Sequence, residues 1–268
     1  MHTFWHLCKQ HLRHYRLTTA IWLAILAMMA YFVAEVAPSV VADNNLTKLL
    51  AQFPQAIRSL FGDPGVYRYP VDLYIQGKWL LFVPLLAGIF GVISAMGIMA
   101  REIDRRTADF VLTLPVRRSL ILSARFAALA FNVGLLYLGS VVMLWLGLRQ
   151  ADITGAIGHY LLFFLGHYFL TLFFAALTLY VSLCLDDYAA ANRYALIIVV
   201  GFYALYLIVK GVGASVWVSR LTLFGLVEAE QVVGRGYPPW LAVFVGGLLT
   251  LVFLWAAIGR MDKKQVPT

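Results

Sequence analysis

The chain has 268 residues, of which 62% are hydrophobic and only 13% are charged. Water-soluble domains carry roughly 25% charged residues, so this composition excludes an ordinary soluble globule and indicates a protein that exposes apolar surface to lipid. The formal net charge of +8 does not indicate a nucleic-acid partner, because the positions of Lys and Arg in a membrane protein mainly report its orientation.

The first segment, residues 1–16, is predicted to form an amphipathic helix. One face carries Phe4, Trp5, Cys8, Leu12 and Tyr15 at helical spacing. The opposite face carries polar and basic side chains, namely His2, His6, Lys9, Gln10 and Arg13. A helix of this kind lies in the membrane interface with its basic residues toward lipid headgroups. We therefore expect an interfacial helix here, with membrane lipid as its partner.

Six apolar runs follow that are each long enough to cross a bilayer, which takes about 20 residues in a helix. They cover residues 17–34, 79–99, 126–148, 159–183, 194–209 and 240–258. Helices are expected because a helix satisfies its own backbone hydrogen bonds in lipid. The prediction is an all-α polytopic membrane protein with one transmembrane domain over residues 1–268. No carboxylate or Lys lies in the middle of these runs, and His159 and His167 lie near the external start of the fourth, which argues against an ion-coupled carrier.

The connections predict the orientation of the chain. Lys and Arg gather before the first span, in the loop after the second span and in the C-terminal tail. Such clusters are typical of the cytoplasmic side, so both termini and residues 100–118 are expected there. Residues 35–78 then form an external loop with short amphipathic turns, and residues 211–239 form an external re-entrant or interfacial segment. We expect a multi-pass protein of a bacterial-type plasma (inner) membrane.

Residues 100–118, "AREIDRRTADFVLTLPVRR", predict a cytoplasmic helix between the second and third spans. Ile103, Thr107, Phe110, Val111 and Leu114 make one apolar stripe at helical spacing. Opposite charges pair four residues apart, Glu102 with Arg106 and Arg105 with Asp109, and Pro115 stops the helix. A plain cytoplasmic loop needs the basic residues but not the stripe. The pattern therefore favours a helix that docks on another protein and transmits its motion.

This stretch resembles the cytoplasmic coupling region of permease subunits of the ABC-2 family of ABC transporters. The resemblance is carried by Glu102, Thr107, "VLTLP" at residues 111–115, and the basic pair Arg117 and Arg118. Arg106 stands where the family usually has Gly. The interfacial helix before six spans, the long first and last external connections and the C-terminal "GRMDKK" agree with the family's architecture.

The resemblance implies a permease subunit of an ATP-driven exporter. It implies that two such chains, as a homodimer or a heterodimer, form the translocation route above two ATP-binding cassette subunits. The residues expected to contact the ATP-binding subunit are Glu102, Arg105, Arg106, Phe110, Arg117 and Arg118. The aromatic spans suit an amphipathic or hydrophobic cargo that is drug-like, peptide or lipid-like.

The chain contains no G-x-x-x-x-G-K-[ST] phosphate loop. We therefore expect ATP and magnesium on a separate subunit, and no catalytic, cofactor or metal site in this chain. Two other readings remain. An intramembrane lipid-modifying enzyme needs clustered polar residues, for which only the pair Asp186 and Asp187 is apparent. A non-transporting membrane scaffold needs no such cluster.

Overall fold

A computed structural model of the chain describes residues 2–41, 50, 52–98, 117–185 and 188–263. Within these ranges the regular structure is helical and no strand occurs. Six of the described helices are long and apolar enough to cross a membrane: Thr3–Val40, Pro70–Met96, Arg118–Gln150, Ile157–Cys184, Ala189–Gly211 and Trp240–Met261. This confirms the predicted all-α fold with six spans.

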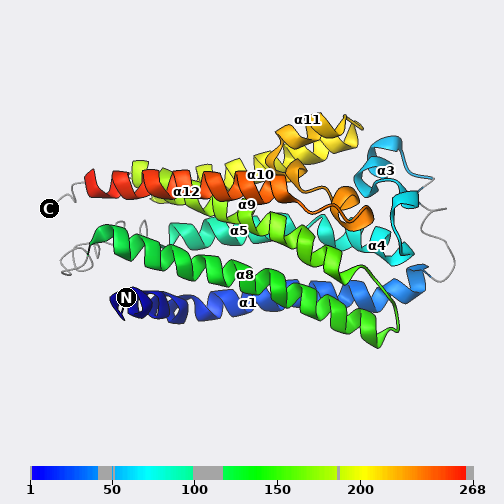
Figure 1. Cartoon of the computed structure of the whole chain (residues 1–268), viewed down its shortest axis with the longest axis horizontal. Coiled ribbons are helices and arrows are strands. Elements are labelled where there is room, and N and C mark those ends of the chain that lie inside the picture. The colour runs from blue at the N-terminus through cyan, green and yellow to red at the C-terminus, as the bar shows by residue number, and fades with distance from the viewer. Residues whose placement is uncertain (1, 42–49, 51, 99–116, 186–187, 264–268) are drawn as a thin grey trace.

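The long helices lie along the long axis of the molecule (Figure 1). They are α1 (His2–Val41), α5 (Val83–Met96), α8 (Arg118–Gln150), α9 (Ile157–Cys184), α10 (Tyr188–Gly211) and α12 (Trp240–Lys263). The short helices α3 (Gln55–Phe61), α4 (Pro70–Ile75) and α11 (Val216–Leu221) gather at the end remote from both termini. Short helical pieces complete this end, namely η1 (Pro64–Val66), η2 (Gln76–Leu80), η3 (Leu223–Leu226) and η4 (Glu230–Gly234).

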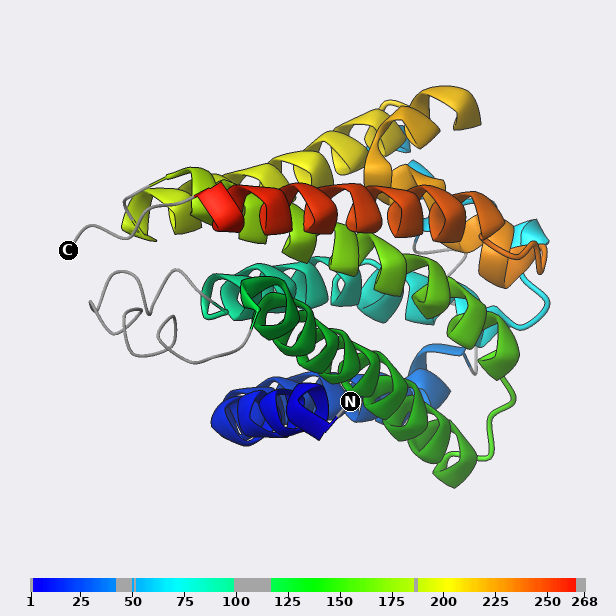
Figure 2. The same ribbon diagram turned by 60° about the vertical axis from the view of Figure 1, so that its left-hand side comes forward.

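Helix α9 lies at the centre of the bundle, where it packs against α5, α8, α10 and α12, while α1 packs mainly against α8. Most side chains of α9 are buried, among them Phe163, Phe164 and Phe174. The outer faces of α1, α8, α10 and α12 expose large apolar side chains such as Phe244 and Trp255. In water this surface would be unfavourable, whereas it matches the hydrocarbon region of a bilayer. Figure 2 shows the same arrangement turned by 60°.

The first helix differs from its prediction in two respects. Helix α1 runs without interruption from His2 to Val41, so the expected boundary between residues 1–16 and the span at residues 17–34 is not a break. The sequence has no Gly or Pro in this helix before Pro38, and nothing else interrupts it. The face packed on the protein holds Cys8, His11 and Tyr15, whereas Trp5 is 66% exposed. The interfacial placement of the first residues stays a prediction.

The second span begins at Pro70 rather than at residue 79, and it is not one regular helix. It consists of α4, the π-helical turn η2, a turn at Leu81 and Phe82, and then α5. Pro84 lies in the first turn of α5, where its missing N–H costs nothing. The region predicted as the external loop 35–78 is therefore helical at both ends, because α1 extends into it and α4 and η2 occupy its last part.

Two further connections were assigned from the sequence, at residues 211–239 and at residues 100–118. Residues 211–239 form the short helical pieces α11, η3 and η4, and their position relative to the membrane stays a prediction. Residues 99–116, which include most of the predicted coupling helix, lie outside the described residues. The end of α5 and the start of α8, which flank them, lie at the same end of the bundle as the start of α1 and the end of α12 (Figures 1 and 2).

Candidate functional site

Of the six residues predicted to contact an ATP-binding subunit, the structure describes two. Glu102, Arg105, Arg106 and Phe110 lie outside the described residues. Arg117 is exposed, and its carbonyl accepts the N–H groups that open α8. Arg118 is half-buried, and its Nη1 donates to the carbonyl oxygen of Met261 at 3.3 Å, which joins the start of α8 to the end of α12. Contact of these residues with a partner stays a prediction.

The two points where residues 99–116 attach are tied to each other. The Nη1 of Arg125 on α8 donates to the carbonyl oxygen of Ile98, just after α5. A Cβ placed on Gly97 would lie 1.5 Å from the Tyr15 hydroxyl oxygen, so only Gly allows α1 to approach this closely. A force applied to residues 99–116 would therefore act on α1, α5 and α8 together.

A buried carboxylate fastens the opposite end of the bundle. Asp72 on α4 is fully buried, and its Oδ1 accepts hydrogen bonds from the backbone N–H of Ala156, at 3.1 Å, and from the Tyr160 hydroxyl. Ala156 directly precedes α9 and makes no side-chain cap of its own. Asp72 therefore caps α9 from another helix, where a negative group is favoured by the helix dipole. This cap links the start of the second span to the start of α9, while α5 packs against α9 along the rest of the two spans.

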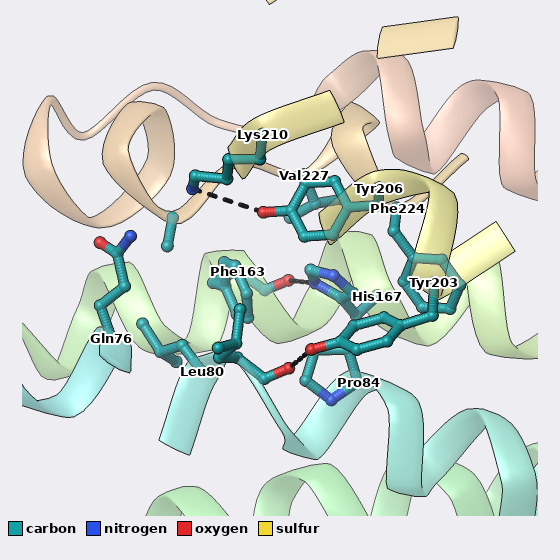
Figure 3. Close-up of a pocket in the computed structure, with 12 residues that line it drawn as sticks. Gln76, Leu80, Pro84, Phe163, His167, Tyr203, Tyr206, Lys210, Phe224 and Val227 are labelled. Atoms are coloured by element: carbon teal, nitrogen blue, oxygen red, sulfur yellow. Dashed lines mark hydrogen bonds between the residues drawn. The ribbon is translucent and has the colours of Figure 1, made fainter. Parts of the chain in front are cut away.

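A small cavity lies beside the break in the second span (Figure 3). The Tyr203 hydroxyl of α10 donates to the carbonyl oxygen of Leu81 in the break. The lining residues come from the second span, α9, α10 and the segment after α11: Gln76, Leu80, Leu81, Pro84, Phe163, His167, Tyr203, Tyr206, Lys210, Phe224, Val227 and Ala229. The cavity volume of ≈ 10 Å³ is about that of one water site. In this conformation it holds no molecule of drug or lipid size.

Several polar groups surround this cavity. Lys210 Nζ donates to the Tyr206 hydroxyl oxygen at 3.4 Å and lies 5.8 Å from the centre of the Tyr206 ring. Gln76 is buried; its Nε2 donates to the Leu60 carbonyl at 3.1 Å, while its Oε1 has no protein partner. His167 Nδ1 lies 3.1 Å from the Phe163 carbonyl, which can only accept, so this nitrogen carries a proton.

The comparison with known families decides the identity of the chain. A family model described as ABC-2 family transporter protein matches residues 23–221. The chain belongs to the ABC-2 transporter family. The matched residues run from α1 to α11 and so include five of the six spans. A search of curated proteins found no significant match.

This ABC-2 family protein is a multi-pass membrane component of transport rather than an enzyme. Permeases of the family generally work with an ATP-binding subunit. Among the described residues, no three His, Cys, Asp or Glu side chains are grouped so as to hold a metal ion. Asp186 and Asp187, on which the enzyme alternative depends, lie outside the described residues.

Sequence reasoning missed Asp72 in this ABC-2 family protein because it assigned residues 35–78 to a loop. The residues on either side of Asp72 did offer a sign of a helix. Pro70 is a common first residue of a helix, and the apolar side chains of Val71, Leu73 and Ile75 are all buried. An Asp in such a first turn is favoured by the helix dipole. That it caps a different helix depends on the tertiary fold and has no sequence signal.

Proposed function

We propose that this chain is the permease subunit of an ATP-driven exporter. The observation that carries the proposal is the family match over residues 23–221 together with six apolar helices. The absence of a phosphate loop from the sequence supports a separate subunit as the site of ATP and magnesium. Transport therefore depends on an ATP-binding cassette subunit that docks from the cytoplasm.

The docking element is the region 100–118, with Glu102, Arg105, Arg106 and Phe110 facing the ATP-binding subunit. The hydrogen bonds of Arg118 and Arg125 support this assignment, because they join the start of α8 to the end of α12 and to Ile98, just after α5. Closure of two ATP-bound subunits moves these helices. Both termini are then cytoplasmic, and the membrane is the plasma membrane of a bacterial-type cell.

Two permease chains, identical or different, form the translocation route between them. The small volume of the cavity at the second span supports this arrangement, since in this conformation that cavity is too small for a cargo of drug, peptide or lipid size. The cargo is amphipathic or hydrophobic, in keeping with the aromatic side chains of the spans, such as Phe163 and Tyr203.

Co-expression of the tagged chain with a candidate ATP-binding subunit tests this proposal. We expect the two proteins to purify together in detergent, and the complex in lipid to hydrolyse ATP several-fold faster than the isolated ATP-binding subunit. The chain alone serves as the control and is expected to hydrolyse none. An ATP-binding subunit that neither binds the chain nor changes its rate of hydrolysis would contradict the proposal.

A further inference from the structure

The cavity beside the break in the second span is lined by Lys210, which makes no ion pair with another described residue. Lys210 lies in the last turn of α10 and is half-buried. Within the described part of the chain, the one ion pair joins Arg235 to Glu230, at 3.6 Å. Glu228 and Glu230 act on Lys210 through space but do not pair with it. Its ammonium group is therefore available to an anion from outside the chain.

The hydrogen-bonding groups around Lys210 also favour an anion. An ammonium group has three N–H donors, and one of them is used on the Tyr206 oxygen. Because Tyr206 accepts that bond, its own hydroxyl hydrogen remains to be donated. Gln76 adds a buried Oε1 without a protein partner, which can accept from a water or from the O–H of a protonated phosphate. The two remaining ammonium N–H groups and the Tyr206 hydroxyl fit the oxygens of a carboxylate or a phosphate monoester.

The rest of the cavity wall is apolar. Leu80, Pro84, Phe163, Phe224 and Val227 line it. Figure 3 shows the amine of Lys210 on the side of the cavity where Gln76 lies, with Phe163 and Leu80 below it in the view. A ligand that satisfies both regions has an anionic head and an alkyl chain. The Tyr203 hydroxyl donates to the Leu81 carbonyl beside the cavity, and the cavity, now about the size of one water site, must widen before such a ligand can enter.

We propose that this cavity binds an anionic amphiphile, a carboxylate or phosphate monoester on an alkyl chain, with Lys210 and Tyr206 on its head. The inference rests on the proposed function, because it names the chemical class of the cargo that the permease carries. The break in the second span makes the site possible: irregular backbone inside a membrane protein occurs where it is buried in protein or lines a cavity.

Photolabelling of the purified full chain in phosphatidylcholine nanodiscs tests the inference. The probe is a photoreactive analogue of dodecanoate, and the competitors are dodecanoate, dodecyl phosphate and methyl dodecanoate. We expect labelling near Lys210 to be displaced by at least one of the two acids, with the uncharged ester weaker by about tenfold or more, because a hydrogen bond to a charged group is lost. The acid that competes better identifies the head group.

Variants at the head-binding residues sharpen the result. Lys210→Met is expected to weaken labelling about tenfold or more, and Lys210→Arg to retain it, since only the latter keeps the charge. Lys78→Met is the matched control, because Lys78 is an exposed lysine at the same end of the bundle and does not line the cavity. Tyr206→Phe keeps the ring, removes one donor and is expected to weaken labelling less than Lys210→Met. Each variant is first shown to be monodisperse and as thermally stable as the parent chain.

Two results would overturn the inference. One is equal competition by the ester and both acids, and the other is equal labelling of Lys210→Met and Lys78→Met. The assay contains no ATP-binding subunit and no ATP. A chain that binds the probe but fails to associate with an ATP-binding subunit would refute the proposed function alone, and a chain that couples to ATP hydrolysis but ignores the probe would refute this inference alone.

Discussion

Replacement of Asp72 by Ala is expected to lower the free energy of unfolding by about 2–5 kcal/mol, because it leaves two buried donors without an acceptor. The Tyr160 hydroxyl and the Ala156 N–H both lose Asp72 Oδ1, and α9 loses its only described cap at the start of the helix. Asp72→Asn keeps an oxygen acceptor and is expected to cost less. The thermal midpoint in detergent, measured for all variants, is the readout.

Asp63→Ala provides the matched control. Asp63 is exposed at the same end of the bundle and caps the short turn η1 by accepting the N–H of Gly65 at 2.9 Å. Loss of an exposed cap costs about 1 kcal/mol, so this variant is expected to remain close to the parent chain. Equal midpoints for Asp72→Ala and Asp63→Ala would show that the contact between α4 and α9 does not hold the two spans together.

The second large effect is expected from charge reversal in the coupling region. Arg105→Glu together with Arg106→Glu is expected to reduce ATP-dependent export and stimulation of ATP hydrolysis about tenfold or more, since a broken charged contact at an interface costs about 2 kcal/mol or more. Both side chains are proposed to face the ATP-binding subunit. Insertion into the membrane is expected to persist because the apolar spans are unchanged.

The control for this double variant lies at the opposite end of the bundle. Arg68 and Arg149 are exposed there, each over an aromatic ring, and Arg68→Glu with Arg149→Glu changes the net charge by the same amount. This control is expected to leave stimulation of ATP hydrolysis intact. If the double variant at Arg105 and Arg106 inserts in normal amount and still stimulates ATP hydrolysis normally, these residues do not contact the ATP-binding subunit.

The six spans were predictable because each is a long apolar run that has few alternatives in lipid. The limits of the spans were less predictable. Asp72 and Lys78 interrupt the apolar pattern before residue 79 and made the start of the second span look like loop, yet Asp72 is buried because Tyr160 and Ala156 accompany it in the fold. A partner on another helix compensates a buried polar group, and no local pattern reports such a partner.

The faces of the first helix show the same limit. Periodicity alone placed Trp5 with Cys8 and Tyr15, whereas the packed face of α1 includes His11 and leaves Trp5 exposed. A helical wheel ranks faces by polarity, but which face packs depends on the neighbour, here including Gly97, whose missing side chain admits Tyr15. The cavity beside the break also depends on four separate segments, so its lining residues had no joint signal in the sequence.

A cysteine cross-link from residues 100–118 to the ATP-binding subunit tests most directly whether this coupling region docks on that subunit. The parent chain for this experiment has Cys8 and Cys184 replaced by Ser. In it, a short bifunctional reagent is predicted to join the cysteine of Phe110→Cys to a nearby residue of the ATP-binding subunit, and the yield of this product is predicted to change with ATP. Phe131→Cys, on the exposed outer face of α8, is predicted to give no such product. Cross-linking from position 131 but not from position 110, or from neither in a complex that hydrolyses ATP, would contradict the account.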